Sequence, residues 1–191
     1  MLVFDTETTA FIAPEAAPIS QQPRIVEFAA INLNPYTLDE VARYEFLVNP
    51  RIPIPPDSTK VHGITDEMVR DQPPFVARYN ELCDIFGGQK SSVVHNSSFD
   101  YRVMFYELFR IGKQTAFPYP PLQFCTVEQS IRLGLGKTEK GDRLKLGQMY
   151  ELLTGKQHKE AHRAMPDVVV LVECVREMRR KYGAFNKWPK K

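Results

Sequence analysis

Hydrophobic and polar positions alternate near the N-terminus in a pattern that predicts three β-strands. The segments 2–7, 24–33 and 43–49 are rich in Val, Ile, Phe and Tyr and are bounded by turn residues. The short link at 34–36 fits a hairpin, so we predict that the first three strands are antiparallel. Residues 10–23 contain three prolines and no clean period, which predicts a surface loop.

After residue 51 the apolar positions recur mostly at helical spacing, interrupted by one short β-branched segment that predicts a buried strand. Strands and helices therefore share one α/β domain, and the chain shows no internal repeat. The elements predicted in this part are a short helix from Thr65, a helix from 75 to 86, a strand at 92–95, and helices at 99–111, 127–133, 146–153 and 166–182.

Composition fits one ordinary globular domain. The chain has 191 residues, of which 43% are hydrophobic and 25% are charged. At this length one core is sufficient, so we predict a single domain over 1–183 followed by a basic tail at 184–191. Residues 176–191 carry seven cations and one acid, whereas the whole chain has a net charge of only +2. This basic end fits either contact with a phosphate backbone or a solvated helix end.

The cysteines and the N-terminal residues indicate the cellular compartment in which we expect the protein. The three cysteines are far apart and odd in number, which fits reduced thiols rather than a disulfide framework or a zinc site. No apolar stretch reaches the ~20 residues that span a bilayer, and the first residues lack the basic start of a signal peptide. We therefore expect a cytoplasmic protein without a membrane partner.

Two acids lie on the first predicted strand. Side chains two residues apart on a strand share a face, so Asp5 and Glu7 point the same way. Like charges at short range repel, and a divalent cation between them would remove that cost. A solvated acidic face on an edge strand is the alternative.

Two further acids and a histidine complete a candidate site. Asp100 falls in the first turn of a helix that follows a buried strand, which is where α/β proteins gather ligands. Pro166 is tolerated only in the first turn of a helix, so Asp167 lies on that helix and His162 on the loop before it. Asp100 taken alone also fits an acid favoured by the helix dipole.

Together these side chains form a set suited to phosphodiester hydrolysis. The four acids Asp5, Glu7, Asp100 and Asp167 offer hard oxygen ligands for Mg²⁺ or Mn²⁺. His162 can accept a proton from an attacking water near neutral pH. Two metal ions in such a site stabilise charge on both the attacking and the leaving oxygen.

Three motifs in this order resemble those of a known family. FDTETT at 4–9, HNSSFD at 95–100 and HRAMPD at 162–167 look like the three exonuclease motifs of the DEDDh, or DnaQ-like, 3′→5′ exonucleases. The resemblance covers almost the whole chain. It implies an RNase H-like fold, in which a mixed five-stranded sheet is flanked by helices, and it implies two metal ions held by the four acids with His162 as the general base.

The resemblance also implies contacts to the terminal nucleotide of the substrate. Backbone groups near Thr6 and Thr8 help to hold that nucleotide, and His62, Asn96 and Phe99 line the same pocket. His62 and Phe99 also fit purely structural roles. Many family members have glycine where this chain has Ala10, and in this chain two apolar residues follow. The loop after the first strand can therefore take a path that differs from the one in the family.

The expected activity is release of nucleoside monophosphates from DNA 3′ ends in repair, turnover or proofreading, with a polymerase or repair protein as a candidate partner. A 3′→5′ exoribonuclease with the same site is the nearest alternative, because selection against RNA depends on contacts near the 2′ position. A non-catalytic nucleic-acid-binding module is a third reading. It would be expected to have lost one of the acids or the histidine, and all five are present.

Overall fold

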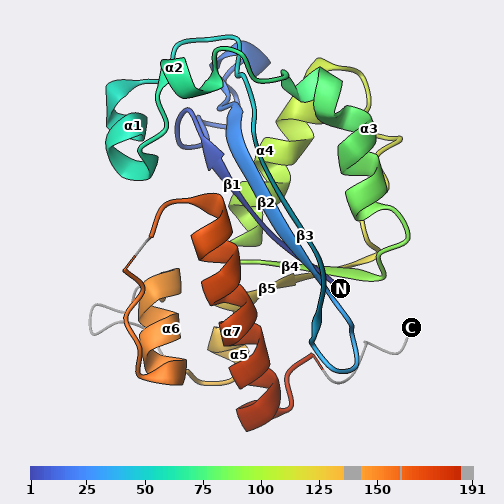
Figure 1. Cartoon of the computed structure of the whole chain (residues 1–191), viewed down its shortest axis with the longest axis vertical. Helices are drawn as coiled ribbons and strands as arrows, with labels where there is room; N and C mark the ends of the chain where they lie inside the picture. The colour runs from blue at the N-terminus through green and yellow to red at the C-terminus, as the bar shows by residue number, and fades with distance from the viewer. Residues whose placement is uncertain (136–142, 160, 186–191) are drawn as a thin grey trace.

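A five-stranded mixed sheet forms the centre of the protein in the computed structural model, which describes residues 1–135, 143–159 and 161–185 (Figure 1). Its strand order is β3-β2-β1-β4-β5, so the acid-bearing first strand is the central one. The strands are β1 (Leu2–Thr8), β2 (Ile25–Leu33), β3 (Glu40–Leu47), β4 (Ser91–Val94) and β5 (Leu122–Cys125).

Strand directions agree with the prediction. β1 pairs antiparallel with β2, and β2 pairs antiparallel with β3. β4 runs parallel to β1, and β5 runs parallel to β4. The carboxyl ends of β1, β4 and β5 therefore meet at one edge of the sheet, which is where loops and helix starts can assemble a site.

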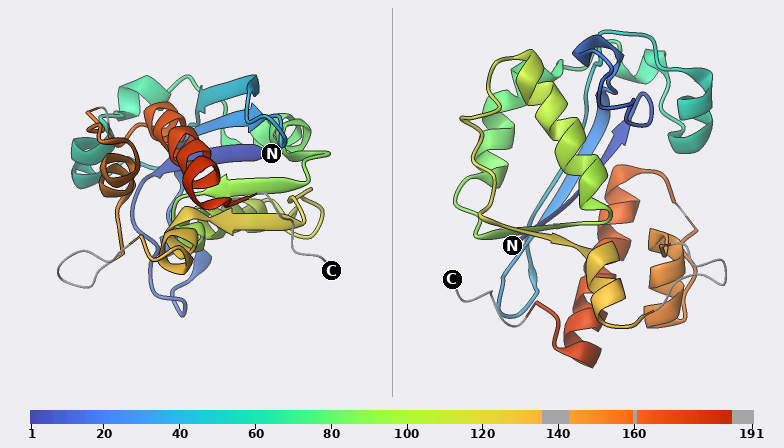
Figure 2. Two further views of the ribbon diagram at one scale, coloured as in Figure 1. Left: turned by 90° about the horizontal axis from the view of Figure 1, so that it is seen from below. Right: turned by 180° about the vertical axis from the view of Figure 1, so that it is seen from behind.

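Helices cover both faces of this sheet (Figure 2). One core joins the sheet to α6 and α7, and a second core joins its other face to α3 and α4. The helices are α1 (Pro56–His62), α2 (Asp66–Val69), α3 (Phe75–Phe86), α4 (Ser97–Arg110), α5 (Thr126–Arg132), α6 (Leu146–Thr154) and α7 (Ala164–Tyr182), with a 3-10 turn at Ile19–Gln21.

Most predicted elements are confirmed within a few residues, and three details are wrong. The prolines at 53, 55 and 56 predict only a link between elements, yet Pro56 begins α1, because a proline at the first helical position costs no hydrogen bond. The spacing of Thr126 and Gln129 predicts a capping box, which is absent: the Thr126 hydroxyl instead donates to the carbonyl oxygen of Val94 at 3.4 Å. β5 was not predicted, since its four residues are too short to show a period.

Parts of two predicted features lie outside the described residues. These are the loop that the charged, glycine-containing segment 137–145 predicts, of which 137–142 are not described, and the basic tail, of which 186–191 are not described. In the described ranges, no helix has the length and apolar character needed to cross a membrane.

Candidate active site

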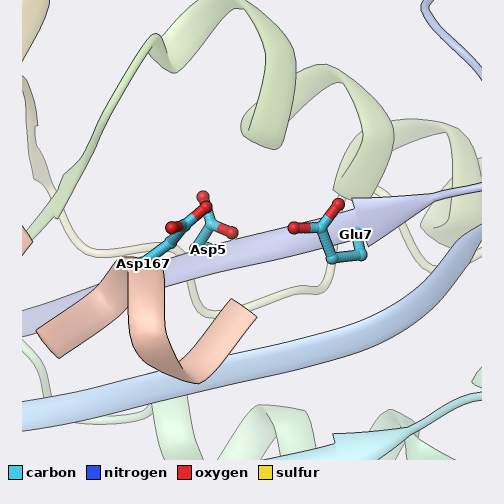
Figure 3. Close-up of side chains that lie close together, drawn as sticks. All are labelled: Asp5, Glu7 and Asp167. Atoms are coloured by element: carbon cyan, nitrogen blue, oxygen red, sulfur yellow. The ribbon is translucent and has the colours of Figure 1, made fainter. Parts of the chain in front are cut away.

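The alternation of side chains along β1 directs two acids toward α7. Val3 belongs to the core shared with α6 and α7, whereas Phe4 belongs to the core on the other face. Asp5 and Glu7 therefore continue on the α7 side, where Asp167 lies in the first turn of that helix. One ligand oxygen from each of the three carboxyl groups lies within 4.8 Å of the other two (Figure 3).

Burial and mutual repulsion make this cluster costly to ionise without a cation. Burial raises the pKa of Asp5 well above its usual range, and the charges of Asp100, Glu7 and Asp167 raise it further. Burial, together with repulsion from Asp167, raises the pKa of Glu7 to about 8. The cluster therefore retains protons near neutral pH when it holds no cation.

Asp100 reaches the site from the other layer of the fold. It lies in the first turn of α4 and is 2% exposed, and its Oδ1 accepts a hydrogen bond of 2.9 Å from the Thr6 hydroxyl. Burial raises its pKa to about 7, although the bond from Thr6 opposes the shift. Asp100 is not part of the group of three carboxyl groups whose oxygens lie close together, yet its charge raises the pKa of Asp5.

The donor set fits hard divalent cations. Carboxylate oxygens are the ligands that Mg²⁺ and Mn²⁺ prefer, and three of them converge here. A cation would also offset the repulsion that raises the pKa of Asp5 and Glu7. Asp5, Glu7 and Asp167, with Asp100 beside them, are therefore the residues that could hold a metal.

His162 lies on the loop before α7, as predicted. Its side chain is exposed, and its backbone N–H donates to Oδ2 of Asp167 at 3.3 Å. Its φ of 71° is in the left-handed region, which residues other than glycine seldom adopt. No pattern in the local sequence predicts this strained backbone next to the carboxyl cluster.

His158 also contacts the cluster, although its place in a charged loop predicts no functional role. Its Nε2 forms a hydrogen bond with Oδ1 of Asp167, and its side chain is 6% exposed. It lies nine residues before that acid on the loop between α6 and α7. Nothing in the local sequence distinguishes it from an ordinary loop histidine.

An ion pair between a buried carboxylate and a partly exposed arginine fixes the loop that carries His162. Glu27 of β2 is 1% exposed and lies opposite Glu7 in the register of the sheet. Its Oε1 accepts from Nη2 of Arg163 at 2.5 Å, and its Oε2 accepts from Nε of Arg163 at 3.0 Å and from the backbone N–H of Ala164 at 2.8 Å. This bidentate contact joins the start of α7 to the sheet directly beside the acids.

We expect Arg163→Ala to destabilise the fold by about 2 kcal/mol, because it removes the charged partner of the buried Glu27 carboxylate, and because the Arg163 side chain is 40% exposed, solvent screens part of the loss. Arg180→Ala is the matched control, since its pair with Glu177 lies at the surface and should contribute less than about 1 kcal/mol. Urea unfolding at constant pH compares the two variants. Equal losses would show that the pair with Glu27 has no special role.

The predicted substrate residues surround the cluster in different ways. The Thr8 hydroxyl donates to the carbonyl oxygen of Ala10, so its side chain is engaged within the chain. His62 is 3% exposed, and its Nε2 is buried near the backbone of Thr8 without a partner of hydrogen-bond geometry among the described residues. Asn96 has a left-handed φ of 70°, and Phe99 packs partly against the core.

The loop after β1 exposes an aromatic side chain. Phe11 is 88% exposed, whereas Ile12 packs partly against the core shared with α3 and α4. The loop is held where the guanidinium of Arg110 donates to the carbonyl oxygens of Ile19 and Gln22 at 2.9 and 2.7 Å. Ile12 therefore anchors this loop, whereas the side chain of Phe11 is open to solvent.

Without metal, the protein is expected to lose stability as the pH rises from about 6.5 to about 8.5. The pKa values of Asp5, Glu7 and Asp100 are raised by burial, so the folded chain holds protons that the unfolded chain has already released. Their stabilising effect is complete below the unfolded values and is lost as the pH rises through the folded values. The change is at most about 1.4 kcal/mol per pH unit for each such carboxyl.

Thermal unfolding in EDTA across this range measures the effect. Burial lowers the pKa of His95 to about 4, which acts in the opposite direction below about pH 6.5 and so sets the lower limit of the window. Added Mg²⁺ should remove the decline, because the cation displaces the retained protons. A midpoint that rises with pH in EDTA would contradict the assignment.

Comparison with known proteins gives a family match over most of the chain. The family model RNase_T, described as Exonuclease, matches residues 2–175. The DNA polymerase III subunit epsilon of Treponema pallidum is 31% identical over 175 residues, which are 92% of this chain and 74% of the relative. The match to the protein of the same name from Haemophilus influenzae spans 54% of that relative's length.

Solved structures share the fold. Exonuclease X in complex with 5′ overhanging duplex DNA has a TM-score of 0.66 at 24% identity, covering 95% of this chain and 92% of that one. The nuclease domain of 3′hExo, a DEDDh family member bound to rAMP, has a TM-score of 0.74 at 18% identity with the same coverage. Both similarities confirm the predicted RNase H-like arrangement of sheet and helices.

Proposed function

The chain belongs to the RNase_T exonuclease family and is a DnaQ-like, metal-dependent 3′→5′ exonuclease, and from this premise we propose that it releases nucleoside monophosphates one at a time from DNA 3′ ends. The proposal rests above all on one observation, the convergence of Asp5, Glu7 and Asp167 on one face of the sheet. Residues 1–183 would act as one exonuclease domain.

We propose that the carboxyl cluster holds two divalent cations, Mg²⁺ or Mn²⁺. Asp5, Glu7 and Asp167 would provide the shared ligands, and Asp100 would bind from the α4 side. The cations would supply stabilisation of the negative charge that develops around the reacting phosphate. Their binding would also explain why so many acids with raised pKa values are gathered at one place.

His162 would act as the general base. A water oxygen forms a bond to the terminal phosphorus while the bond between that phosphorus and the 3′ oxygen of the preceding nucleotide breaks. One proton of the water passes to the imidazole of His162, and the departing 3′ oxygen takes a proton from solvent. The left-handed backbone of His162, fixed by the pair between Arg163 and Glu27, would keep the imidazole at the mouth of the site.

The terminal nucleotide would sit between the β1 end and α1. Among the described residues, Nε2 of His62 has no partner of full hydrogen-bond geometry and lies near the backbone of Thr8, so a polar group of the nucleotide would satisfy it. Asn96 and Phe99 at the start of α4, together with the backbone around Thr6, would line the opposite wall. An exposed aromatic such as Phe11 would stack on a base of the strand end.

DNA is the substrate that we propose. The relatives compared above are named as subunits of a DNA polymerase, and Exonuclease X was solved with duplex DNA. A structure with rAMP exists for 3′hExo, so RNA is the alternative that the experiment must separate. The acid cluster itself acts on the phosphodiester, which both polymers share.

The test uses single-stranded DNA, duplex DNA and RNA of one sequence, each with a 5′ label, in Mg²⁺, Mn²⁺ or EDTA. We expect a ladder that shortens from the 3′ end with either metal, is absent in EDTA and is most extensive on DNA. If RNA is shortened faster than DNA, RNA is the substrate and the proposal of DNA is wrong. A folded, metal-bound protein that cleaves none of the three would be a nucleic-acid-binding module instead.

We further propose a polymerase as the partner of the protein, because the relatives are named as polymerase subunits. Gel filtration of the chain mixed with the replicative polymerase of the same organism tests this step. Co-elution is the expected result, and separate elution at micromolar concentrations would leave the chain as a free exonuclease.

A further inference from the structure

The loop between α6 and α7 brings a second histidine to the carboxyl cluster. Nε2 of His158 forms a hydrogen bond with Oδ1 of Asp167, and this imidazole is almost fully enclosed, at 6% exposure. The other oxygen of Asp167, Oδ2, accepts the backbone N–H of His162. Both oxygens of this acid therefore have partners outside the group of three carboxyl groups.

The surroundings of His158 hold its side chain in place. A Cβ built onto Gly147 of α6 would lie 3.8 Å from the Cβ of His158, so the loop packs closely against that helix. Lys156, two residues earlier, donates to Glu173 of α7 at 3.3 Å, and the same carboxylate oxygen accepts from the Tyr150 hydroxyl at 3.0 Å. The loop is thus joined to both α6 and α7.

The chemistry of this contact determines which of the two side chains donates the hydrogen bond. A metal ligand has to be ionised, and an ionised carboxylate only accepts hydrogen bonds, so Nε2 of His158 must donate. A donor fixed on one oxygen limits rotation of the Asp167 carboxyl and leaves its remaining lone pairs available to a cation. Partners of this kind commonly set the orientation and the affinity of metal-binding side chains.

We propose that His158 is a positioning residue that orients Asp167 for the cation, a role distinct from the proton transfer assigned to His162. The inference rests on the proposed metal-dependent function and deepens it, because it names a determinant of cation affinity. His158 lies outside the three motifs that carry the family resemblance.

Direct titration with Mn²⁺, followed by electron paramagnetic resonance of the free ion, tests the proposal without substrate. We expect His158→Ala to weaken Mn²⁺ binding about 10- to 100-fold. His158→Gln should recover most of that loss, because its amide nitrogen can donate from nearly the position of Nε2. Gln157→Ala is the matched control, an exposed neighbour on the same loop, and should bind as the parent does.

Turnover gives a second readout that a merely structural role would not produce. The Mn²⁺ concentration needed for half-maximal rate should rise with the loss of affinity in His158→Ala, while the rate at saturating Mn²⁺ stays within a few-fold of the parent. Thermal unfolding in EDTA verifies that each variant is folded. If His158→Ala does not fold, the Mn²⁺ affinity of His158→Gln still decides the test.

Several outcomes would overturn the inference. Unchanged or tighter Mn²⁺ binding in His158→Ala would mean that the imidazole is idle or competes with the cation. An equal loss in Gln157→Ala would assign the effect to the loop rather than to the imidazole. A rate lost at saturating Mn²⁺ with unchanged affinity would make His158 a proton carrier. If the parent itself bound no Mn²⁺, the proposed function would fail first, and the two failures are thereby distinguished.

Discussion

Replacing Asp5 with alanine will abolish hydrolysis and leave the chain folded. Asp5 lies at the centre of the acid cluster, where the charges of Asp100, Glu7 and Asp167 all act on it. Its loss removes a shared ligand for the cations, whose stabilisation of the reacting phosphate amounts to several kcal/mol, so we expect the rate to fall about 1,000-fold or more. The same change relieves repulsion, so the midpoint of thermal unfolding in EDTA should stay equal or rise.

Asp39→Ala is the control for this prediction, because Asp39 is an exposed acid between β2 and β3, at the end of β2 opposite to the one that pairs with Glu7. It should keep the parental rate and the parental stability. Asp5→Asn separates charge from shape, since it preserves the side-chain volume and should be as inactive as the alanine variant. An Asp5→Ala protein that hydrolyses DNA at the parental rate would exclude this carboxyl cluster as the active site.

The local parts of the site could be predicted from the sequence because they follow from short-range geometry. A period of two on β1 places Asp5 and Glu7 on one face, and Pro166 places Asp167 in the first turn of its helix. The order of the motifs then indicated the family, and with it the sheet that brings these segments together. The three ligand oxygens within 4.8 Å of one another agree with that expectation.

The remaining features depend on contacts between distant parts of the chain. Glu27 and Arg163 are 136 residues apart, and only the sheet and the start of α7 make them neighbours. A charged residue within the apolar run of β2 was the available signal that Glu27 needs a partner. His158 carried no such signal, because its bond to Asp167 depends on how the α6–α7 loop closes over α7. The periodicity of apolar residues predicts helices and strands, but it does not predict the path of a loop between them.

Replacing His162 will remove most of the rate without weakening the binding of the metal. Its side chain is exposed, and among the hydrogen bonds of the described residues it contacts Asp167 only through its backbone N–H. Loss of a general base costs about 100- to 10,000-fold in rate. Mn²⁺ affinity should stay at the parental value in His162→Ala, because the backbone N–H of this residue remains.

His162→Gly distinguishes the imidazole from the backbone that carries it. A φ of 71° costs a residue other than glycine about 1 kcal/mol or more, whereas glycine adopts it freely. The glycine variant should therefore unfold at a higher urea concentration than the alanine variant, yet be as slow in hydrolysis. The expected pattern is opposite to that of His158→Ala, in which Mn²⁺ affinity falls and the rate at saturating Mn²⁺ persists. A His162→Gly protein with parental turnover would remove the general base from the mechanism and assign the strained backbone at residue 162 to folding alone.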